Sequence, residues 1–191
     1  VDIFRLDAVA YMWKDIGRFN QNLPEVHTLL QIFKMCGQVV APGIAYIAEA
    51  IVAPEEIVKY FGEAEAEGNE CDIAYNATFM ALSWEAIASG NTDLLRKSMY
   101  SVPKKPMNTT WINYARCHDD IGLGFEDKLI QELGKNPLMH RLYMLRYYCD
   151  EQRGKRFMQE PNGNARLSGS MASLCGLEKA LEEKNDFQIH L

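Results

Sequence analysis

Hydrophobic and polar positions follow one another in blocks that predict short strands separated by amphipathic helices. The runs that read as strands are apolar, β-branched or aromatic and cover residues 1–7, 44–49, 71–76 and 109–117. The stretches that read as helices have apolar residues three and four apart and cover residues 24–40, 54–61, 77–89 and 93–100. Strands that alternate with helices predict βαβ units and a parallel sheet.

The first helix carries the clearest end signals. Asn22 is expected to cap it, Pro24 to occupy its first turn and Glu25 to lie at the positive end of its dipole. Its apolar residues are expected to form one buried stripe, made of Val26, Leu29, Leu30, Phe33 and Val40.

Beyond Ile121 the alternation ends. The remaining patterns predict helices at residues 128–133, 138–152 and 174–184, with a turn at residues 161–164. No further buried strand is expected there. This part of the chain is therefore predicted to be a helical insertion or lid beside the sheet.

Three of the four predicted strands lead into a carboxylate, namely Asp7, Glu49 and Asp119. Parallel strands that deliver functional residues at their carboxyl ends are typical of a (β/α)8 barrel, whose active site lies on that rim. A nucleotide-binding fold would need a glycine-rich phosphate turn after a strand, and none is recognisable. The expected fold class is therefore α/β, with part of a (β/α)8 TIM barrel.

The spacing of these acids suits retaining glycoside hydrolysis, which needs a nucleophilic carboxylate and a second carboxyl group that acts as acid and then as base. Arg5 and Asp7 lie two apart on a strand, so they share a face, and the guanidinium keeps the carboxylate ionised. Glu49 follows an apolar run that favours its protonated form. Two alternatives are a surface ion pair at Arg5 and Asp7, or acids that hold a divalent metal ion.

The fourth strand runs into His118, Asp119 and Asp120. His118 is a candidate ligand for a sugar hydroxyl, Asp119 a candidate stabiliser of the transition state, and Asp120 a contact for a neighbouring sugar. The pair of Cys117 and His118 is rejected as a nucleophile and its base, because neighbours on a strand face opposite ways.

The composition narrows the class of partner. The chain has 191 residues, of which 48% are hydrophobic and 24% charged, which fits one globular domain. A net charge of −6 without a basic stripe argues against nucleic acid. No apolar run is long enough to cross a membrane, and the N-terminus shows no signal-peptide pattern. The acidic residues 63–70 are expected to be solvated. They are the only feature that would support a third class of function, a protein-interaction module.

The five cysteines are widely separated and make no zinc-ligand spacing with the histidines, so zinc is not expected, and no calcium-binding loop is recognisable. They are expected to be reduced and mostly buried. A reducing compartment, the cytoplasm, is therefore the expected location.

Three stretches resemble the conserved blocks of the α-amylase superfamily, glycoside hydrolase family 13, and these are Phe4–Ala10, Ala48–Ile51 and Asn113–Gly122. The resemblance implies that Asp7 is the nucleophile, Glu49 the acid/base and Asp119 the transition-state stabiliser. No cofactor is expected, because the acid pair suffices for the chemistry. By the same resemblance, residues 1–119 would hold strands four to seven of the barrel.

Within the superfamily the chain looks most like the amylosucrase subfamily, which transfers glucose from sucrose to an α-glucan. The stretches that carry this likeness are 22–24, 49–54, 71–76 and 166–169. It implies that Arg5 and His118 bind the glucosyl unit and that Asp120 and Arg166 touch the adjoining sugar. Residues 120–176 would form an insertion after strand seven, and residues 177–191 a return helix.

The same resemblance leaves four strands of the barrel unaccounted for, because a complete barrel takes about 250 residues. The chain is therefore expected to be a fragment whose exposed sheet edges favour self-association and which is inactive alone. The expected function is a retaining transglucosidase acting on sucrose or an α-glucan. The alternatives are a hydrolase of sucrose or α-glucosides, and an inactive fragment of such an enzyme.

Overall fold

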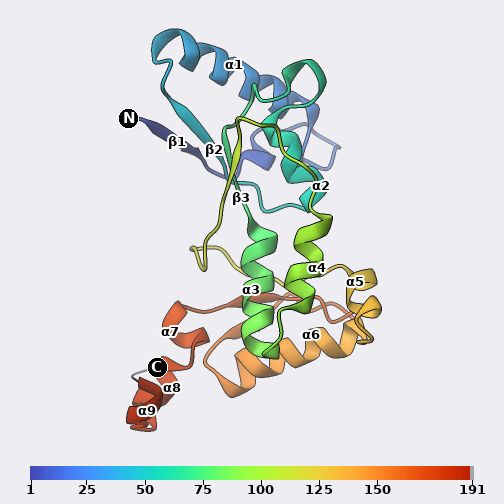
Figure 1. Ribbon diagram of the computed structural model, residues 1–191, viewed down its shortest axis with the longest axis vertical. Helices are drawn as coiled ribbons and strands as arrows, with labels where there is room; N and C mark the ends of the chain where they lie inside the picture. Colours follow the sequence, from blue (N-terminus) through green and yellow to red (C-terminus); the bar gives the residue numbers. More distant parts are fainter. Residues whose placement is uncertain (190–191) are drawn as a thin grey trace. The chain divides into compact units, whose positions relative to one another are not determined.

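The protein is described by a computed structural model that covers residues 1–189 and has two compact units (Figure 1). The first unit consists of Val1–Thr78 and Val102–Tyr114, and the second of Phe79–Ser101 and Ala115–Leu191. Neither unit is one continuous segment. The predicted division of the chain at residues 119 and 176 stays a prediction.

The first unit is built on a parallel sheet, as the alternating pattern predicts. Its strands are β1 (Ile3–Leu6), β2 (Ala45–Ala48), β3 (Ile73–Tyr75) and β4 (Thr110–Ile112), in the order β1-β2-β3-β4. All three pairings are parallel. Within residues 1–189 this sheet is open, with β1 and β4 as its outer strands. The α/β class is thus confirmed, while the assignment of these strands to part of a (β/α)8 barrel stays a prediction.

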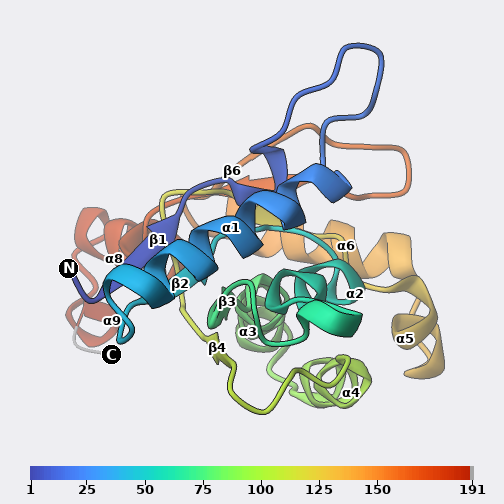
Figure 2. The same ribbon diagram turned by 90° about the horizontal axis from the view of Figure 1, so that it is seen from above.

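Helical segments connect each strand to the next. Between β1 and β2 lie η1 (Val9–Tyr11) and α1 (Pro24–Val40); between β2 and β3 lie α2 (Pro54–Ile57), η2 (Val58–Phe61) and η3 (Ala64–Ala66). Between β3 and β4 lie α3 (Ala77–Ser89) and α4 (Asp93–Ser101). Figure 2 shows α1 running along β1 and β2, where the Tyr46 hydroxyl on β2 donates to the Phe33 carbonyl at 3.0 Å.

The two faces of the sheet have different roles. Ala48 and Ala74 are completely buried and Tyr46 nearly so, and they belong to the core that packs against the helical segments. Side chains alternate along a strand, so Arg5 and Ile47 point to the opposite face. Asp7 and Glu49, two positions further along, share that face. The core therefore occupies one face and leaves the other for polar side chains.

The buried stripe of α1 differs from the predicted one. It runs through Val26, Leu30, Lys34 and Gly37, whereas Val40 is 83% exposed. Lys34 belongs to it because its ammonium group pairs with Asp72, directly before β3. Gly37 belongs to it because a Cβ there would lie 2.5 Å from the Tyr46 hydroxyl. Close packing against Tyr46 thus requires glycine at position 37, which the predicted stripe did not include.

Asn22 does not cap α1. Leu23 occupies the cap position without a side-chain hydrogen bond, while Pro24 and Glu25 lie in the first turn as predicted. The Asn22 side chain instead accepts a hydrogen bond from the Tyr60 hydroxyl at 2.6 Å. This contact ties the start of α1 to η2.

The second unit contains helices and a small antiparallel sheet, and the prediction of no further buried strand is wrong. The sheet has the order β5-β7-β6, with β5 at Ile121–Gly122, β6 at Lys155–Phe157 and β7 at Arg166–Ser168. Ile121 and Leu167 are fully buried. Unlike β3 and β4, which lie within longer runs of apolar, aromatic or β-branched residues, these strands lie in segments without such a run, which explains why the sequence pattern misses them.

The second unit includes α4 and, from Phe79 onward, α3, and its remaining helices lie close to the predicted positions. They are α5 (Asp127–Glu132), α6 (Pro137–Leu145), the π-helical segment η4 (Arg146–Glu151), α7 (Met171–Leu174), α8 (Leu177–Glu182) and α9 (Asp186–Ile189). Buried Arg141 on α6 donates to the carbonyls of Leu123 and Phe125 at 3.0 and 2.6 Å. These bonds hold the segment after β5 against α6. The predicted helix at 174–184 is broken at Gly176, whose φ is +79°.

Glu70 corrects the expectation that the acidic stretch is wholly solvated. Its side chain is only 2% exposed. One carboxylate oxygen accepts a hydrogen bond from the Gln31 amide at 3.0 Å, and the other lies 2.8 Å from His27 Nδ1. Glu63, Glu65 and Glu67 are exposed as expected. One acid of the run therefore fastens the segment before β3 to α1.

The five cysteines are free thiols, but the expectation that most are buried is wrong. Cys71 is buried, Cys117 and Cys149 are partly buried, and Cys36 and Cys175 are exposed. No helix within residues 1–189 is both long and apolar enough to pass through a membrane.

We expect the Glu70→Gln variant to lower the free energy of unfolding by about 1–2 kcal/mol, because an amide cannot accept hydrogen bonds on both of its heavy atoms. Urea unfolding measures this change. Glu67→Gln makes the same substitution on an exposed side chain and is the matched control. Equal unfolding midpoints for the two variants would show that the buried acid does not fasten this segment.

Candidate active site

The register of the sheet brings Asp7 and Glu49 together. Leu6 pairs with Ala48 as the last rung of β1 and β2, so the next residue of each strand is an acid. Ala48 also pairs with Ala74. Glu49 therefore stands level with Tyr75, the last residue of β3. Residues level with one another on neighbouring strands point to the same face, so these three side chains share the face opposite the core.

Arg5 connects the two acids. Its Nη1 donates to Asp7 Oδ1 at 2.7 Å, as the two-residue spacing predicts, and its Nη2 forms an ion pair with Glu49 Oε1. The pKa of Arg5 is raised above its already high ordinary value, first by the hydrogen bond to the Tyr75 hydroxyl. Burial acts in the opposite direction, and Asp7 and Glu49 add to the rise. The guanidinium is therefore a permanent positive charge between two carboxylates.

The backbone after β1 also contacts Glu49. The amide of Ala8 donates to Glu49 Oε2 at 2.9 Å, and the amide of Val9 donates to the Glu49 carbonyl at 3.1 Å. Ala8 has the left-handed conformation, with φ 45° and ψ 40°. This conformation is unfavourable for alanine, and such strain is common at functional sites. The turn thus aims one backbone amide at the buried acid.

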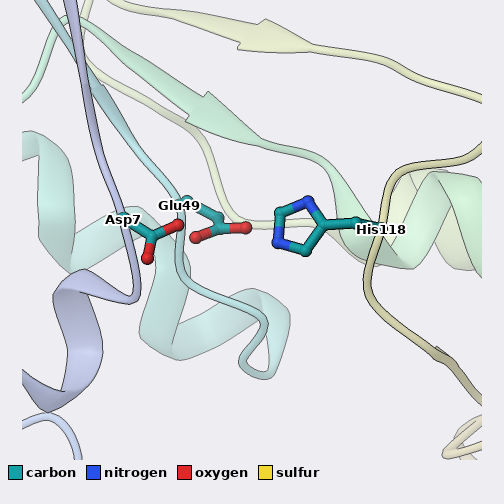
Figure 3. A group of neighbouring side chains, drawn as sticks. All are labelled: Asp7, Glu49 and His118. Carbon is teal, nitrogen blue, oxygen red and sulfur yellow. The ribbon is translucent and has the colours of Figure 1, made fainter.

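Asp7 and Glu49 differ in their access to solvent. The Asp7 side chain is 69% exposed and the Glu49 side chain 6% exposed. One carboxylate oxygen of Asp7 lies within 4.8 Å of one of Glu49, and Figure 3 shows the two groups turned toward each other. Glu49 is buried as its apolar run predicts. However, its two oxygens face Arg5 and an amide, so its immediate surroundings are polar.

Tyr75 is a member of this group that the sequence analysis missed. Its hydroxyl accepts a hydrogen bond from Arg5 Nε at 3.0 Å, and the guanidinium carbon lies 5.5 Å from the centre of its ring. The available signal was the strand-end position of Tyr75, equivalent to those of Asp7 and Glu49. An aromatic residue at a strand end is also what a core requires, so the signal was not specific.

The arrangement in the first unit disfavours a metal ion between the two acids. Two close carboxylates attract a cation, and here the Arg5 guanidinium supplies the positive charge to both. A divalent ion at that position would lie against the guanidinium, and the two charges would repel. The alternative of a metal-dependent site is therefore less favourable than an acid pair held by arginine.

The remaining predicted residues lie in the second unit, in and beside the segment that leads into β5. His118, also labelled in Figure 3, is 71% exposed, and its Nε2 is 3.6 Å from Asp119 Oδ1. Arg116 shapes this segment, because its guanidinium donates to the carbonyls of Asp119 and Gly169. The convergence of His118 and Asp119 with the acids of the first unit stays a prediction.

Asp120 and Arg166 belong to the same small sheet. Arg166 pairs with Gly122 across β5 and β7, and Asp120 precedes β5 by one residue. A Cβ at Gly122 would lie 3.5 Å from Arg166 Nη1, so the guanidinium lies over this glycine. Residues two apart share a face, which places Asp120 on the side of the strand that Arg166 covers. The roles of both residues in sugar binding stay predictions.

The structure agrees with the rejection of Cys117 as a nucleophile. Burial is the main cause that raises the pKa of its thiol, with the Asp119 charge also acting in that direction. A catalytic cysteine needs a lowered pKa to form the thiolate. Cys117 is therefore in the unreactive form at neutral pH.

Comparison with known proteins identifies relatives of this chain. No protein-family model matches the chain. It is 30% identical over 144 residues to a trehalose synthase/amylase of Mycolicibacterium smegmatis, and 31% identical over 119 residues to a glucosylglycerate phosphorylase of Escherichia coli. These matches cover 73% and 62% of this chain, and 24% and 21% of the relatives. The chain belongs to the α-amylase superfamily.

The fold agrees with this membership. A crystal structure of sucrose 6F-phosphate phosphorylase from Thermoanaerobacter thermosaccharolyticum matches with a TM-score of 0.62 and 20% identity. The match covers 93% of this chain and 34% of that structure. As a member of the α-amylase superfamily, the chain thus spans about a quarter of the length of the curated relatives given above. The finer likeness to amylosucrase stays a prediction.

We expect the Ala8→Val variant to lower the free energy of unfolding by about 1–2 kcal/mol, because a β-branched residue fits the left-handed conformation worse than alanine. Thermal unfolding measures the change. Ala53→Val is the matched control, since Ala53 is also exposed but has an extended backbone, with φ −60° and ψ 153°. If both variants unfold at the same temperature, the turn at Ala8 is not strained.

Proposed function

We propose that this chain carries the nucleophile and the acid/base of a retaining enzyme that cleaves or transfers α-glucosyl units. The observation that supports this most directly is the close approach of Asp7 and Glu49, whose nearest ligand oxygens lie within 4.8 Å. Retaining enzymes hold their two carboxyl groups about 5 Å apart, whereas inverting enzymes leave room for a water molecule between them. The spacing therefore favours double displacement.

Asp7 is the better nucleophile of the two acids. Its carboxylate is accessible and is kept ionised by Arg5, whose charge is permanent. In the first step an Asp7 oxygen attacks the anomeric carbon, the bond to the leaving oxygen breaks, and Glu49 gives that oxygen a proton. The product is a glucosyl ester on Asp7 and an ionised Glu49.

The contacts of Glu49 support the second step of this proposal. Its oxygens accept from Arg5 and from the Ala8 amide, which suits a carboxylate that will take a proton from the acceptor. The acceptor oxygen then attacks the anomeric carbon and releases Asp7. In the first step one Glu49 oxygen must carry the proton, which makes that oxygen a weaker acceptor for the hydrogen bond it receives.

The second unit supplies the remaining roles in this proposal. Asp119 stabilises the positive charge that develops on the sugar ring, and His118 binds a hydroxyl of the same glucosyl unit together with Arg5. Asp120 and Arg166 contact the adjoining sugar. The exposure of His118, at 71%, leaves its ring available for such a ligand.

The substrate class proposed is sucrose or an α-glucan oligosaccharide. The curated relatives are named for the synthesis of trehalose and the phosphorolysis of a glucosyl compound. A glucosyl ester that passes to a sugar hydroxyl, to water or to phosphate accounts for names of all these kinds. Transfer to an α-glucan, as in the amylosucrase subfamily, and simple hydrolysis are then two fates of one intermediate. Measuring glucan formed against glucose released separates them.

Replacing each acid by alanine and adding azide tests the two roles. In the intact protein, each single variant is expected to lose about three orders of magnitude or more of activity toward 4-nitrophenyl α-glucoside. Azide fits the space of a missing carboxylate. With Asp7→Ala it attacks the sugar directly and gives the β-glucosyl azide, whereas with Glu49→Ala it attacks the ester on Asp7 and gives the α-glucosyl azide.

Asp15→Ala is the matched control, because the Asp15 side chain is exposed and its carboxylate forms an ion pair with Arg18, at 3.2 Å, and not with Arg5. This variant should keep the activity of the parent and form no azide adduct. The opposite anomers, or β-azide from both variants, would contradict the assigned roles. The 191-residue chain assayed alone is expected to be inactive.

A further inference from the structure

We propose that Tyr75 is a positioning residue of the site, which orients the Arg5 guanidinium so that it holds Asp7 and Glu49 at the same time. This proposal rests on the proposed function for its catalytic consequence. Its structural part, the orientation of Arg5, stands on the contacts of the first unit alone.

The Arg5 guanidinium uses a different nitrogen for each of its three partners. Nε donates to the Tyr75 hydroxyl at 3.0 Å, Nη1 donates to Asp7 and Nη2 to Glu49. The three partners come from three neighbouring strands, β1, β2 and β3, at the same end of the sheet. Three acceptors on one planar group fix both its position and its rotation.

Without the Tyr75 hydroxyl, the two carboxylates do not fix this orientation. Arginine prefers to bind a single carboxylate with two parallel hydrogen bonds. The Asp7 side chain is 69% exposed and therefore able to turn toward such a pairing. The guanidinium would then bind one acid at the expense of the other. By occupying Nε, Tyr75 keeps that nitrogen from joining such a pairing with either acid.

Tyr75 is itself held firmly. It pairs with Ile112 across β3 and β4, and the next amide, that of Asn76, donates to the Ile112 carbonyl at 3.1 Å. Its ring lies 4.9 Å from the ring of Tyr114, with an angle of 45° between the two planes. Backbone pairing and ring packing thus place the hydroxyl.

A hydroxyl group is the acceptor that this position requires. A third carboxylate would compete with Asp7 and Glu49 for the charge of Arg5 and would repel both of them. A phenolic oxygen accepts the hydrogen bond without adding a negative charge at neutral pH. Tyr75 therefore orients the guanidinium and leaves its charge to the two acids.

Tyr75→Phe removes this acceptor and keeps the ring. Tyr46→Phe is the matched control, because it also removes one hydroxyl hydrogen bond of 3.0 Å from the same sheet, but the Tyr46 hydroxyl bonds to Phe33 on α1. In the intact protein, with 4-nitrophenyl α-glucoside, Tyr75→Phe is expected to lower kcat roughly 10- to 100-fold and to change KM less than about twofold. Tyr75→Phe should also shift the acid limb of the pH profile of kcat. Tyr46→Phe should leave kcat and its pH profile unchanged.

A nuclear magnetic resonance measurement tests the structural part without any activity. The Arg5 Nε proton of the unmodified protein should exchange with water at least about tenfold more slowly than that of Arg96, whose side chain is 70% exposed. Tyr75→Phe should remove this protection and Tyr46→Phe should preserve it. Equal exchange for Arg5 and Arg96 in the unmodified protein would overturn the proposal.

The two measurements separate the possible failures. The Arg5 Nε proton could be protected from exchange by Tyr75 in a protein that does not cleave the glucoside. That result would support the orientation of Arg5 by Tyr75 and contradict the proposed function. Cleavage with kcat and a pH profile unaffected by Tyr75→Phe overturns the positioning role and leaves the function intact. If the Tyr75→Phe variant does not fold, the exchange rate of the Arg5 Nε proton in the unmodified protein still tests whether the guanidinium is held in place.

Discussion

The bridge from Arg5 to Asp7 and Glu49 is the interaction on which the candidate site depends. Two carboxylates at neighbouring strand ends repel each other, and at a separation of a few ångströms this repulsion would favour the uptake of a proton or a cation by one of them. A permanent positive charge between them removes that repulsion. β1 and β2 can then both end in an acid at the same level, and the register that pairs them carries no cost from repulsion between the two carboxylates.

The rest of the first unit is arranged around this face of the sheet. Small residues such as Ala48 and Ala74 occupy the opposite face, where the core packs. Tyr46 reaches α1 through its hydroxyl, and Gly37 leaves the space for it. The strained turn at Ala8 closes the end of β1 and gives Glu49 a second donor. Packing on one face thus fixes the polar geometry on the other.

Part of this could be predicted from the sequence because it depends on local spacing. The alternation along β1 places Arg5 beside Asp7, and the strand-end positions of Asp7 and Glu49 follow from the helix and strand pattern. The contact of Arg5 with Glu49 depends on the register between β1 and β2, which the pattern does not determine. The same holds for Tyr75, whose role appears only when three strands are placed side by side.

Other features escaped the sequence because polar residues have structural roles there. Lys34 lies in the buried stripe of α1 because Asp72 is within reach, and Glu70 is buried because His27 and Gln31 surround it. Composition alone assigns lysine and a run of glutamates to the surface. The strands β5, β6 and β7 lie in segments without a longer apolar run and are defined by their pairing.

The central claim, that Asp7 is the nucleophile of a retaining glucosyl transfer, is tested most directly by trapping the covalent intermediate. The intact protein is treated with 5-fluoro-α-glucosyl fluoride, whose fluorine atom slows the second step more than the first, and the labelled peptide is identified by mass spectrometry. Asp7→Asn is the control for the site of attachment. The account predicts one fluoroglucosyl group on Asp7 and none in the variant. Attachment to Glu49, or a label that persists in Asp7→Asn, would contradict it.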